Sequence, residues 1–284
     1  MDVLARKLPM QYRIAGTPLA RLMDQAEVLE RAIHELINEK RQEKETGKDV
    51  LSVLVEAAKI DGIEMNDTFL AAHAVILHAA AFITTASALA WTMYLIAQNP
   101  KFAAALHEEI KNNITDWPPT PETVEKLPFL DGLVRESLRL LPPVHHTMRT
   151  TTKETELLGV PLQTADRVVI SAFMTHRDPA IFKNPTQFDP TRWFEGKPGP
   201  FQYIPFSAGP RLCLGYQFAM LEMKLVVIRI MQRFRMNVIP DSIIEADIRL
   251  TLRPVNGIPM VVNNPDGAFA ASSVRGNINE LVQN

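Results

Sequence analysis

The only cysteine of this 284-residue chain, Cys213, stands in a segment whose residue types could hold a metal ion. The residues from Phe206 to Gly215, FSAGPRLCLG, contain two glycines and a proline and therefore predict a tight turn. The apolar run YQFAMLEMKLVVIRIMQRF follows directly and predicts a buried helix. Backbone N–H groups at the start of that helix and its dipole would stabilise a thiolate, which can bind iron. The alternative is a buried, chemically inert cysteine.

The spacing Phe206-x-x-Gly209-x-Arg211-x-Cys213-x-Gly215 resembles the haem-binding signature of the cytochrome P450 family. In that family a cysteine thiolate is the axial ligand of the haem iron. The resemblance implies haem b as the cofactor and Cys213 as its iron ligand. It also implies that Phe206 shields the sulfur side of the haem, that Arg211 pairs with a haem propionate, and that Gly209 and Gly215 complete the cofactor-binding loop.

A second motif, Glu136-x-x-Arg139, lies in the amphipathic segment VEKLPFLDGLVRESLRLLPP. A Glu–Arg pair three residues apart on a helix is usually a solvated surface pair. Arg192, in the segment HRDPAIFKNPTQFDPTRW, could likewise be a surface residue of a proline-rich loop. The P450 resemblance implies instead that Glu136, Arg139 and Arg192 form one structural cluster, which locks the helix against the haem loop.

A charge-free stretch extends from Thr68 through Pro100, in which no Asp, Glu, Lys or Arg occurs. Its length is sufficient to span a bilayer, but histidines and hydroxyl residues interrupt it and no cluster of Lys or Arg flanks it. A buried central helix fits this pattern at least as well as a single membrane span. The P450 resemblance implies the long helix that covers the distal face of the haem.

Within that helix, the segment Ala80 to Thr85 aligns with the oxygen-activating segment of the family and places Thr84 at the catalytic threonine. The residue before this threonine is usually acidic in the family, whereas this chain has Ile83. The substitution removes one proton relay, because a hydroxyl can organise water but cannot supply protons as an acid can. The alternative for Thr84 is a hydroxyl that only hydrogen-bonds within its own helix.

Several residues after Pro143 are assigned to the site by their offset from the Glu136-x-x-Arg139 motif. Arg149 stands where the family commonly supplies a second cation to the haem propionates, although it could equally be a charge at a strand edge. His145, His146 and Met148 align with a segment that lines the substrate pocket, or are ordinary loop residues.

Composition predicts a mainly α protein of the α+β class, with 46% hydrophobic residues and a net charge of −2. The absence of a basic excess argues against nucleic acid as a partner. A single cysteine excludes an intrachain disulfide and is compatible with a reducing compartment. Strand patterns occur in the segments 154–163, 167–173, 249–253 and 258–262.

The resemblance implies an N-terminally truncated P450 fold: one C-terminal part of a P450 domain over residues 1–263, followed by a flexible tail over 264–284. The N-terminal portion that the family has in addition would carry any membrane anchor and much of the substrate pocket. Membrane association is therefore expected only through that portion, for example at the cytosolic face of the endoplasmic reticulum if the full-length form is eukaryotic.

The function implied by the resemblance is a haem-thiolate monooxygenase that inserts one oxygen atom from O2 into a lipophilic small molecule. Electrons would come from a separate reductase or ferredoxin, because the chain has no flavin or nicotinamide fingerprint of its own. Ile83 leaves open an isomerase, a dehydratase or a peroxygenase of the same type. A non-catalytic remnant is the remaining alternative, and the sequence does not define the substrate.

Overall fold

Two separate hydrophobic cores organise the chain in the computed structural model. The structure describes residues 13–42, 47–60, 65–196, 198–248 and 250–283. The chain divides into two compact units after Ala80. The position of this division lies inside a continuous helix. We describe each unit by itself.

The N-terminal unit contains the helices α1 (Pro18–Gln42) and α2 (Val50–Ala57) and the beginning of α3 (Asp67–Gln98). Side-chain caps start the helices: Asp49 accepts a hydrogen bond from the Ser52 N–H at 2.9 Å, and Asn66 accepts one from the Phe69 N–H at 2.8 Å. A small core closes the unit, formed by Ile33, Ile37, Val55, Leu70 and Ala71.

Helix α3 is the one helix among the described residues that is long and apolar enough to cross a membrane by length and composition. Its C-terminal half, however, lies in the core of the second unit, where Trp91, Tyr94 and Leu95 are fully buried. The Thr92 hydroxyl donates to the Ala88 carbonyl at 2.8 Å, so this buried polar group is satisfied within the protein. This half of α3 is therefore a buried helix, which is one of the two alternatives that the sequence left open.

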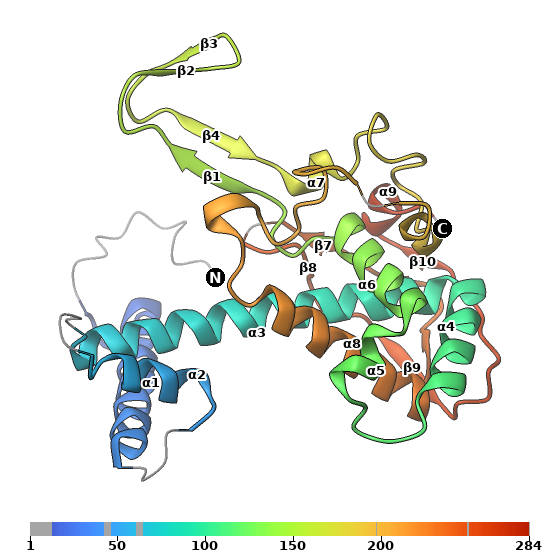
Figure 1. Cartoon of the computed structure of the whole chain (residues 1–284), viewed down its shortest axis with the longest axis horizontal. Coiled ribbons are helices and arrows are strands. Elements are labelled where there is room, and N and C mark those ends of the chain that lie inside the picture. The colour runs from blue at the N-terminus through green and yellow to red at the C-terminus, as the bar shows by residue number, and fades with distance from the viewer. Residues whose placement is uncertain (1–12, 43–46, 61–64, 197, 249, 284) are drawn as a thin grey trace. The chain divides into compact units, whose positions relative to one another are not determined.

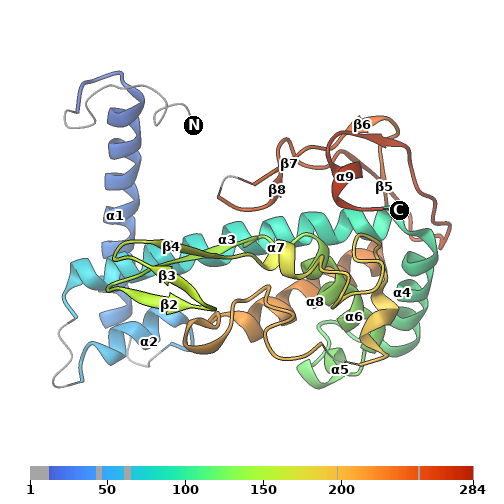
Figure 2. The same ribbon diagram turned by 90° about the horizontal axis from the view of Figure 1, so that it is seen from above.

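Four helices pack with that half of α3 in the second unit (Figures 1 and 2). They are α4 (Pro100–Asn113), α5 (Pro121–Glu125), α6 (Pro128–Leu140) and α8 (Tyr216–Arg233). The first three begin with proline. The N–H of a first helical residue has no acceptor within the helix, so proline, which has no N–H, is well suited to this position. Apolar residues at helical spacing fill the core between them, among them Ala103, Leu106, Ile110, Leu130, Leu133, Val134, Met223, Val227 and Ile228.

The strands of the second unit form small two-stranded ladders. Strand β1 (Thr147–Thr150) pairs antiparallel with β4 (Arg167–Ile170), and β2 (Thr155–Leu157) pairs antiparallel with β3 (Val160–Leu162). The other ladders are β5–β9 (Arg235–Val238 with Met260–Asn263), β6–β10 (Ser242–Ile243 with Val274–Arg275) and β7–β8 (Ala246–Asp247 with Arg253–Pro254). Mainly helical structure with small sheets was predicted from the sequence.

The strand predicted over residues 167–173 ends earlier than its apolar pattern indicated. Ser171 accepts a hydrogen bond from the Met174 N–H at 3.2 Å and starts the short helix α7 (Ala172–Thr175). A side-chain cap of this kind offers the backbone an alternative to the ladder, and here the cap prevails over β propensity.

The expectation of a flexible tail over 264–284 is wrong for its described residues, 264–283. This segment contains β10 and the short helix α9 (Ile278–Leu281), and Ile278 is fully buried. Gln98 of α3 exchanges two hydrogen bonds with the backbone of Ser272, each 3.0 Å long. A few well-placed apolar side chains are enough to fix a polar segment, which an average over its composition does not reveal.

Candidate functional site

The loop before α8 presents Cys213 as an exposed, free thiol. The Cys213 N–H donates to the carbonyl of Phe206 at 2.9 Å and closes the loop on itself. Gly209 has φ +63°, a left-handed conformation that favours glycine, and begins a 3-10 turn over Gly209–Arg211. Gly215 then caps α8, so the thiol stands just before the first turn of a core helix.

The Phe206 side chain packs against the core of the second unit rather than standing free. Its ring meets the ring of Tyr216 edge to face, with centroids 5.1 Å apart. Core packing and a wall beside the thiol are compatible roles for this side chain, because the Phe206 backbone also holds Cys213.

The structure brings together the three residues that the sequence analysis assigned to one cluster. Arg139 donates to both carboxylate oxygens of Glu136, from Nε at 2.9 Å and from Nη2 at 2.8 Å. Arg192 donates from Nε to Glu136 Oε1 at 2.9 Å. Glu136 and Arg139 are fully buried, so the pair is not a solvated surface pair on α6.

Backbone groups complete the hydrogen bonding of this cluster. The Arg139 guanidinium donates to the carbonyls of His176 and Pro185, both at 2.7 Å, and of Gln187 at 3.1 Å. Glu136 also accepts from the Asp189 N–H and from the Trp193 indole, each at 3.1 Å. Buried charges are tolerated where every donor and acceptor finds a partner, and this cluster ties α6 to the segment 176–193.

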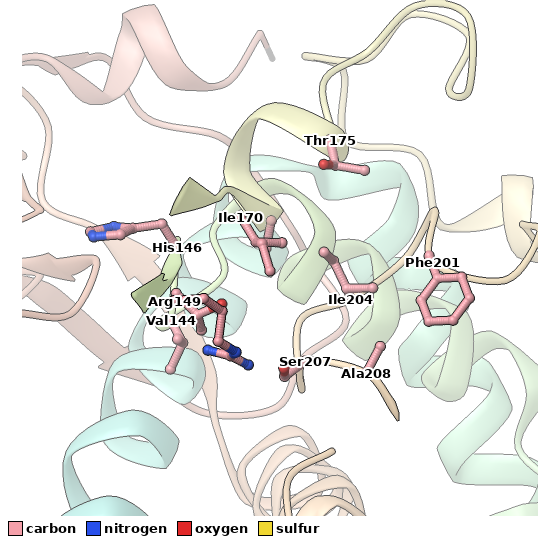
Figure 3. Close-up of a pocket in the computed structure, with 11 residues that line it drawn as sticks. Val144, His146, Arg149, Ile170, Thr175, Phe201, Ile204, Ser207 and Ala208 are labelled. Carbon is pink, nitrogen blue, oxygen red and sulfur yellow. The ribbon is translucent and has the colours of Figure 1, made fainter. Parts of the chain in front are cut away.

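Two neighbouring cavities open beside this loop in the second unit. The first, about 290 Å³ in volume, is lined by side chains from β1 and the residues just before it, from β4 and from the segment before Cys213, including His146, Arg149, Ile170 and Ile204 (Figure 3). The second, about 450 Å³, is lined by both Arg149 and Arg211. The two cations predicted for the haem propionates therefore face one cavity, although Arg149 also donates to the Met148 carbonyl at 2.9 Å.

The two histidines that follow Pro143 differ in their surroundings. His146 lines the first cavity, whereas burial and the neighbouring His146 ring lower the pKa of His145 below its ordinary value. Met148 lines the second cavity. Two of the three predicted pocket residues thus line a cavity.

Thr84 lies half-buried on α3, one residue after a partly exposed Ile83. Phe82, on the same helix, is 67% exposed. One turn further, the Ser87 hydroxyl donates to the Ile83 carbonyl at 2.8 Å, which is the intrahelical bonding considered for Thr84. The position before Thr84 therefore offers an apolar side chain where the family usually has an acid.

His176 and Tyr203 belong to the site's framework and were not singled out from the sequence. His176 is fully buried, and its ring stacks on Tyr203 with centroids 5.3 Å apart. Burial lowers the pKa of His176 to about 3, the Arg139 carbonyl opposes that shift, and the guanidiniums of Arg139 and Arg177 add to it. No local pattern indicates this role, because the partners of His176 lie far away along the chain.

These residues fit a haem held by sulfur. No group of three or more His, Cys, Asp or Glu side chains that could hold a metal ion occurs in the part of the chain that the structure describes. A metal carried by Cys213 would therefore need most of its ligands from elsewhere, as an iron porphyrin provides them. The accessible thiol and the two arginines at a neighbouring cavity match the sulfur ligand and the carboxylate partners that such a cofactor requires. The class is that of haem-thiolate proteins.

Comparison with known proteins gives the family. The model of the family "Cytochrome P450" matches residues 5–259, and the chain belongs to this family, whose proteins bind haem as their cofactor. The chain is 38% identical to "Cyclooctatin synthase" of Streptomyces melanosporofaciens over 217 residues, covering 74% of this chain and 47% of that protein. It is 32% identical to "Cytochrome P450 3A5" of Homo sapiens over 231 residues, covering 78% and 46%.

A solved structure extends the likeness to the fold. "Retinoic acid bound cyanobacterial CYP120A1" superposes with a TM-score of 0.82 at 26% identity, covering 89% of this chain and 59% of that one. The P450 fold expected from the sequence is thereby confirmed. The chain spans about half the length of the two relatives named above.

Proposed function

We propose that this chain provides the sulfur-ligand part of a haem-thiolate monooxygenase that inserts one oxygen atom from O2 into a lipophilic small molecule. The observation that carries the proposal is the exposed Cys213 thiol, held by the Phe206 carbonyl at the start of α8, in a chain of the P450 family. A separate reductase or ferredoxin would supply the electrons. One structural neighbour is described as bound to retinoic acid, and this ligand supports a lipophilic substrate class.

The bound haem would supply the oxygen chemistry, and the residues of the chain have defined tasks around it. Cys213 would donate electron density to the iron as a thiolate. Arg149 and Arg211 would pair with the propionates at the cavity that they share. Phe206 would keep water from the sulfur, and the Thr84 hydroxyl would hold and pass a proton at its oxygen atom.

The ligand assignment is tested by absorption spectroscopy of the haem-reconstituted, reduced chain with carbon monoxide. We expect a thiolate-type spectrum that Cys213→Ala abolishes, because no second cysteine can replace the ligand. Leu214→Ala is the matched control, since Leu214 is 92% exposed and adjoins Cys213 without providing a ligand atom. A thiolate-type spectrum that persists in Cys213→Ala would overturn the proposal.

Ile83 favours a second candidate function, a P450-type isomerase, dehydratase or peroxygenase, which needs no proton delivery to O2. The variant Ile83→Asp separates the two candidates in the complete enzyme. An oxygenase should convert a larger fraction of its reducing equivalents into hydroxylated product when an acid stands beside Thr84. Unchanged or poorer coupling would favour the second candidate. Ile83→Asn is the matched control, because asparagine is similar in size to aspartate but is not an acid.

A further inference from the structure

The buried ring of His176 lies between the Glu136–Arg139–Arg192 cluster and the segment that leads to Cys213. Its Nδ1 is 3.2 Å from the carbonyl oxygen of Arg139. Its Nε2 is 2.9 Å from the backbone nitrogen of Ile204. The carbonyl of His176 in turn accepts from the Arg139 guanidinium at 2.7 Å, so both the ring and the backbone of this residue are held by Arg139.

These two partners define the tautomer of His176. A backbone carbonyl can only accept and a backbone N–H can only donate, so Nδ1 must carry the proton and Nε2 must offer its lone pair. Neutral imidazole is the one form that serves both partners. The side chain therefore acts as a rigid bridge, with one end on α6 and the other on Ile204.

The bridge continues through the backbone to the cysteine. The Ile204 carbonyl accepts from the Ser207 N–H at 3.1 Å, and the Phe206 carbonyl accepts from the Cys213 N–H at 2.9 Å. A displacement of Ile204 would thus move Phe206, to which the Cys213 backbone is hydrogen-bonded.

Packing of neighbouring aromatic rings also holds the imidazole in place. Tyr203 stacks on it and donates from its hydroxyl to the Arg135 carbonyl at 3.0 Å. The Trp193 ring meets Tyr203 at 4.6 Å between centroids, and the Trp193 indole donates to Glu136. Packing and hydrogen bonding at position 176 can therefore be separated by substitution, because an amide of suitable length can restore the hydrogen bond without the ring.

We propose that His176 is a positioning residue that fixes the Cys213 loop to the buried cluster through its hydrogen bond with Ile204. The inference rests on the proposed function, because the thiol that it positions is the proposed iron ligand. A loop without this bond would still carry Cys213, but the sulfur would no longer be held at one place, and a smaller fraction of bound haem would be ligated by thiolate.

A pair of variants that differ by one methylene group tests the bond. The side-chain amide of His176→Gln can reach the place of Nε2 and accept from Ile204, whereas that of His176→Asn reaches only the place of Nδ1, near the Arg139 carbonyl. A first readout, the hydrogen exchange of the Ile204 amide, needs no haem. A second is the thiolate-type fraction in the carbon-monoxide spectrum of the reduced, haem-reconstituted chain.

We expect His176→Asn to accelerate exchange of the Ile204 amide about tenfold, the factor expected for one lost buried hydrogen bond, and to lower the thiolate fraction. His176→Gln should restore both readouts toward those of the parent chain. Leu106→Ala, a cavity variant of the fully buried α4 core, is the control for a general loss of stability and should leave Ile204 exchange unchanged relative to neighbouring amides.

Equal Ile204 exchange in the Asn variant and the parent would overturn the inference, as would an equal loss of thiolate ligation in Leu106→Ala at matched stability. Bound haem without thiolate ligation in the parent chain would overturn the proposed function alone. In that case the hydrogen bond between His176 and Ile204 would still be tested by comparing the Ile204 exchange rates of the parent, Gln and Asn chains.

Discussion

Glu136 supplies the negative charge that pairs with both arginines of the buried cluster. Its carboxylate pairs with Arg139 and Arg192 and accepts from the backbone of Asp189. We expect Glu136→Ala to lower the free energy of unfolding by about 3–5 kcal/mol, because it leaves a fully buried guanidinium without its counter-charge. Denaturant unfolding measures this loss. Glu108→Ala, on the exposed face of α4, should change the same quantity by less than about 0.5 kcal/mol. Equal effects of the two variants would contradict a buried cluster.

His176 makes the stability of the fold depend on pH in a predictable direction. Burial lowers its pKa from 6.5 to about 3, so between these values the unfolded chain binds a proton that the folded chain does not bind. The contribution of a neutral His176 is therefore fully present above pH 6.5 and is lost as the pH falls toward 3. We expect His176→Gln to reduce the slope of unfolding free energy against pH in this window by up to about 1.4 kcal/mol per pH unit. Parallel pH profiles of the parent and variant chains would contradict this prediction.

At this scale the sequence predicted what short motifs encode. Glu136 and Arg139 are three residues apart on one helix, and the P450 resemblance indicated Arg192 as their partner. The role of His176 has no such signal, because it arises only when the fold brings Arg139 and Ile204 to the same ring, from 37 and 28 residues away.

Among the elements, the loop before α8 has a glycine near each end, and only Gly209 has a backbone conformation that favours glycine. Gly209 has φ +63°, and no heavy atom lies within 4 Å of the place that a Cβ atom would take, so Gly209→Ala meets backbone strain without a clash. We expect it to lower the free energy of unfolding by about 1–2 kcal/mol. Gly215→Ala is the matched control: its φ of −85° suits any residue, and the added carbon would lie 4.0 Å from the Cys213 sulfur. A cost in Gly215→Ala as large as that in Gly209→Ala would contradict the strain argument.

Helix α6 could be predicted from its periodicity, because it buries an apolar face in the core, whereas α3 could be predicted from its long charge-free stretch. The ends of elements were less predictable. Ser171 stops β4 and starts α7 by a side-chain cap, which competes with an apolar pattern that continues to Phe173. The C-terminal segment was misjudged because a few buried side chains, such as Ile278 and Val282, anchor it among polar neighbours.

For the whole molecule, the division after Ala80 has no counterpart in the sequence. Helix α3 continues through it without a glycine or proline, and the two ends of the helix belong to different hydrophobic cores. The P450 fold class, in contrast, was predictable, since it depends on ordered motifs and on a composition that favours helices.

Large apolar side chains remain exposed on the second unit, and this governs how the isolated chain should behave. Leu214 is 92% exposed, Phe218 69% and Phe82 67%. Such surfaces promote association, and a haem needs apolar walls on both of its faces. We expect the isolated chain to self-associate and to bind less than one haem per chain, as measured by light scattering and by haem titration. A soluble monomer with stoichiometric, thiolate-ligated haem would contradict this prediction.

Arg139 bonds to residues that lie far along the chain, and this affects the order in which the parts of the site form during folding. Its guanidinium bonds carbonyl groups 37, 46 and 48 residues further on, so the contacts of the cluster close long loops. Closing such loops is slow compared with forming a helix. The backbone around Cys213 hangs from the same region through Ile204, and the thiol therefore gains its native surroundings late in folding. We therefore expect a cofactor to meet a finished site only after these loops have closed.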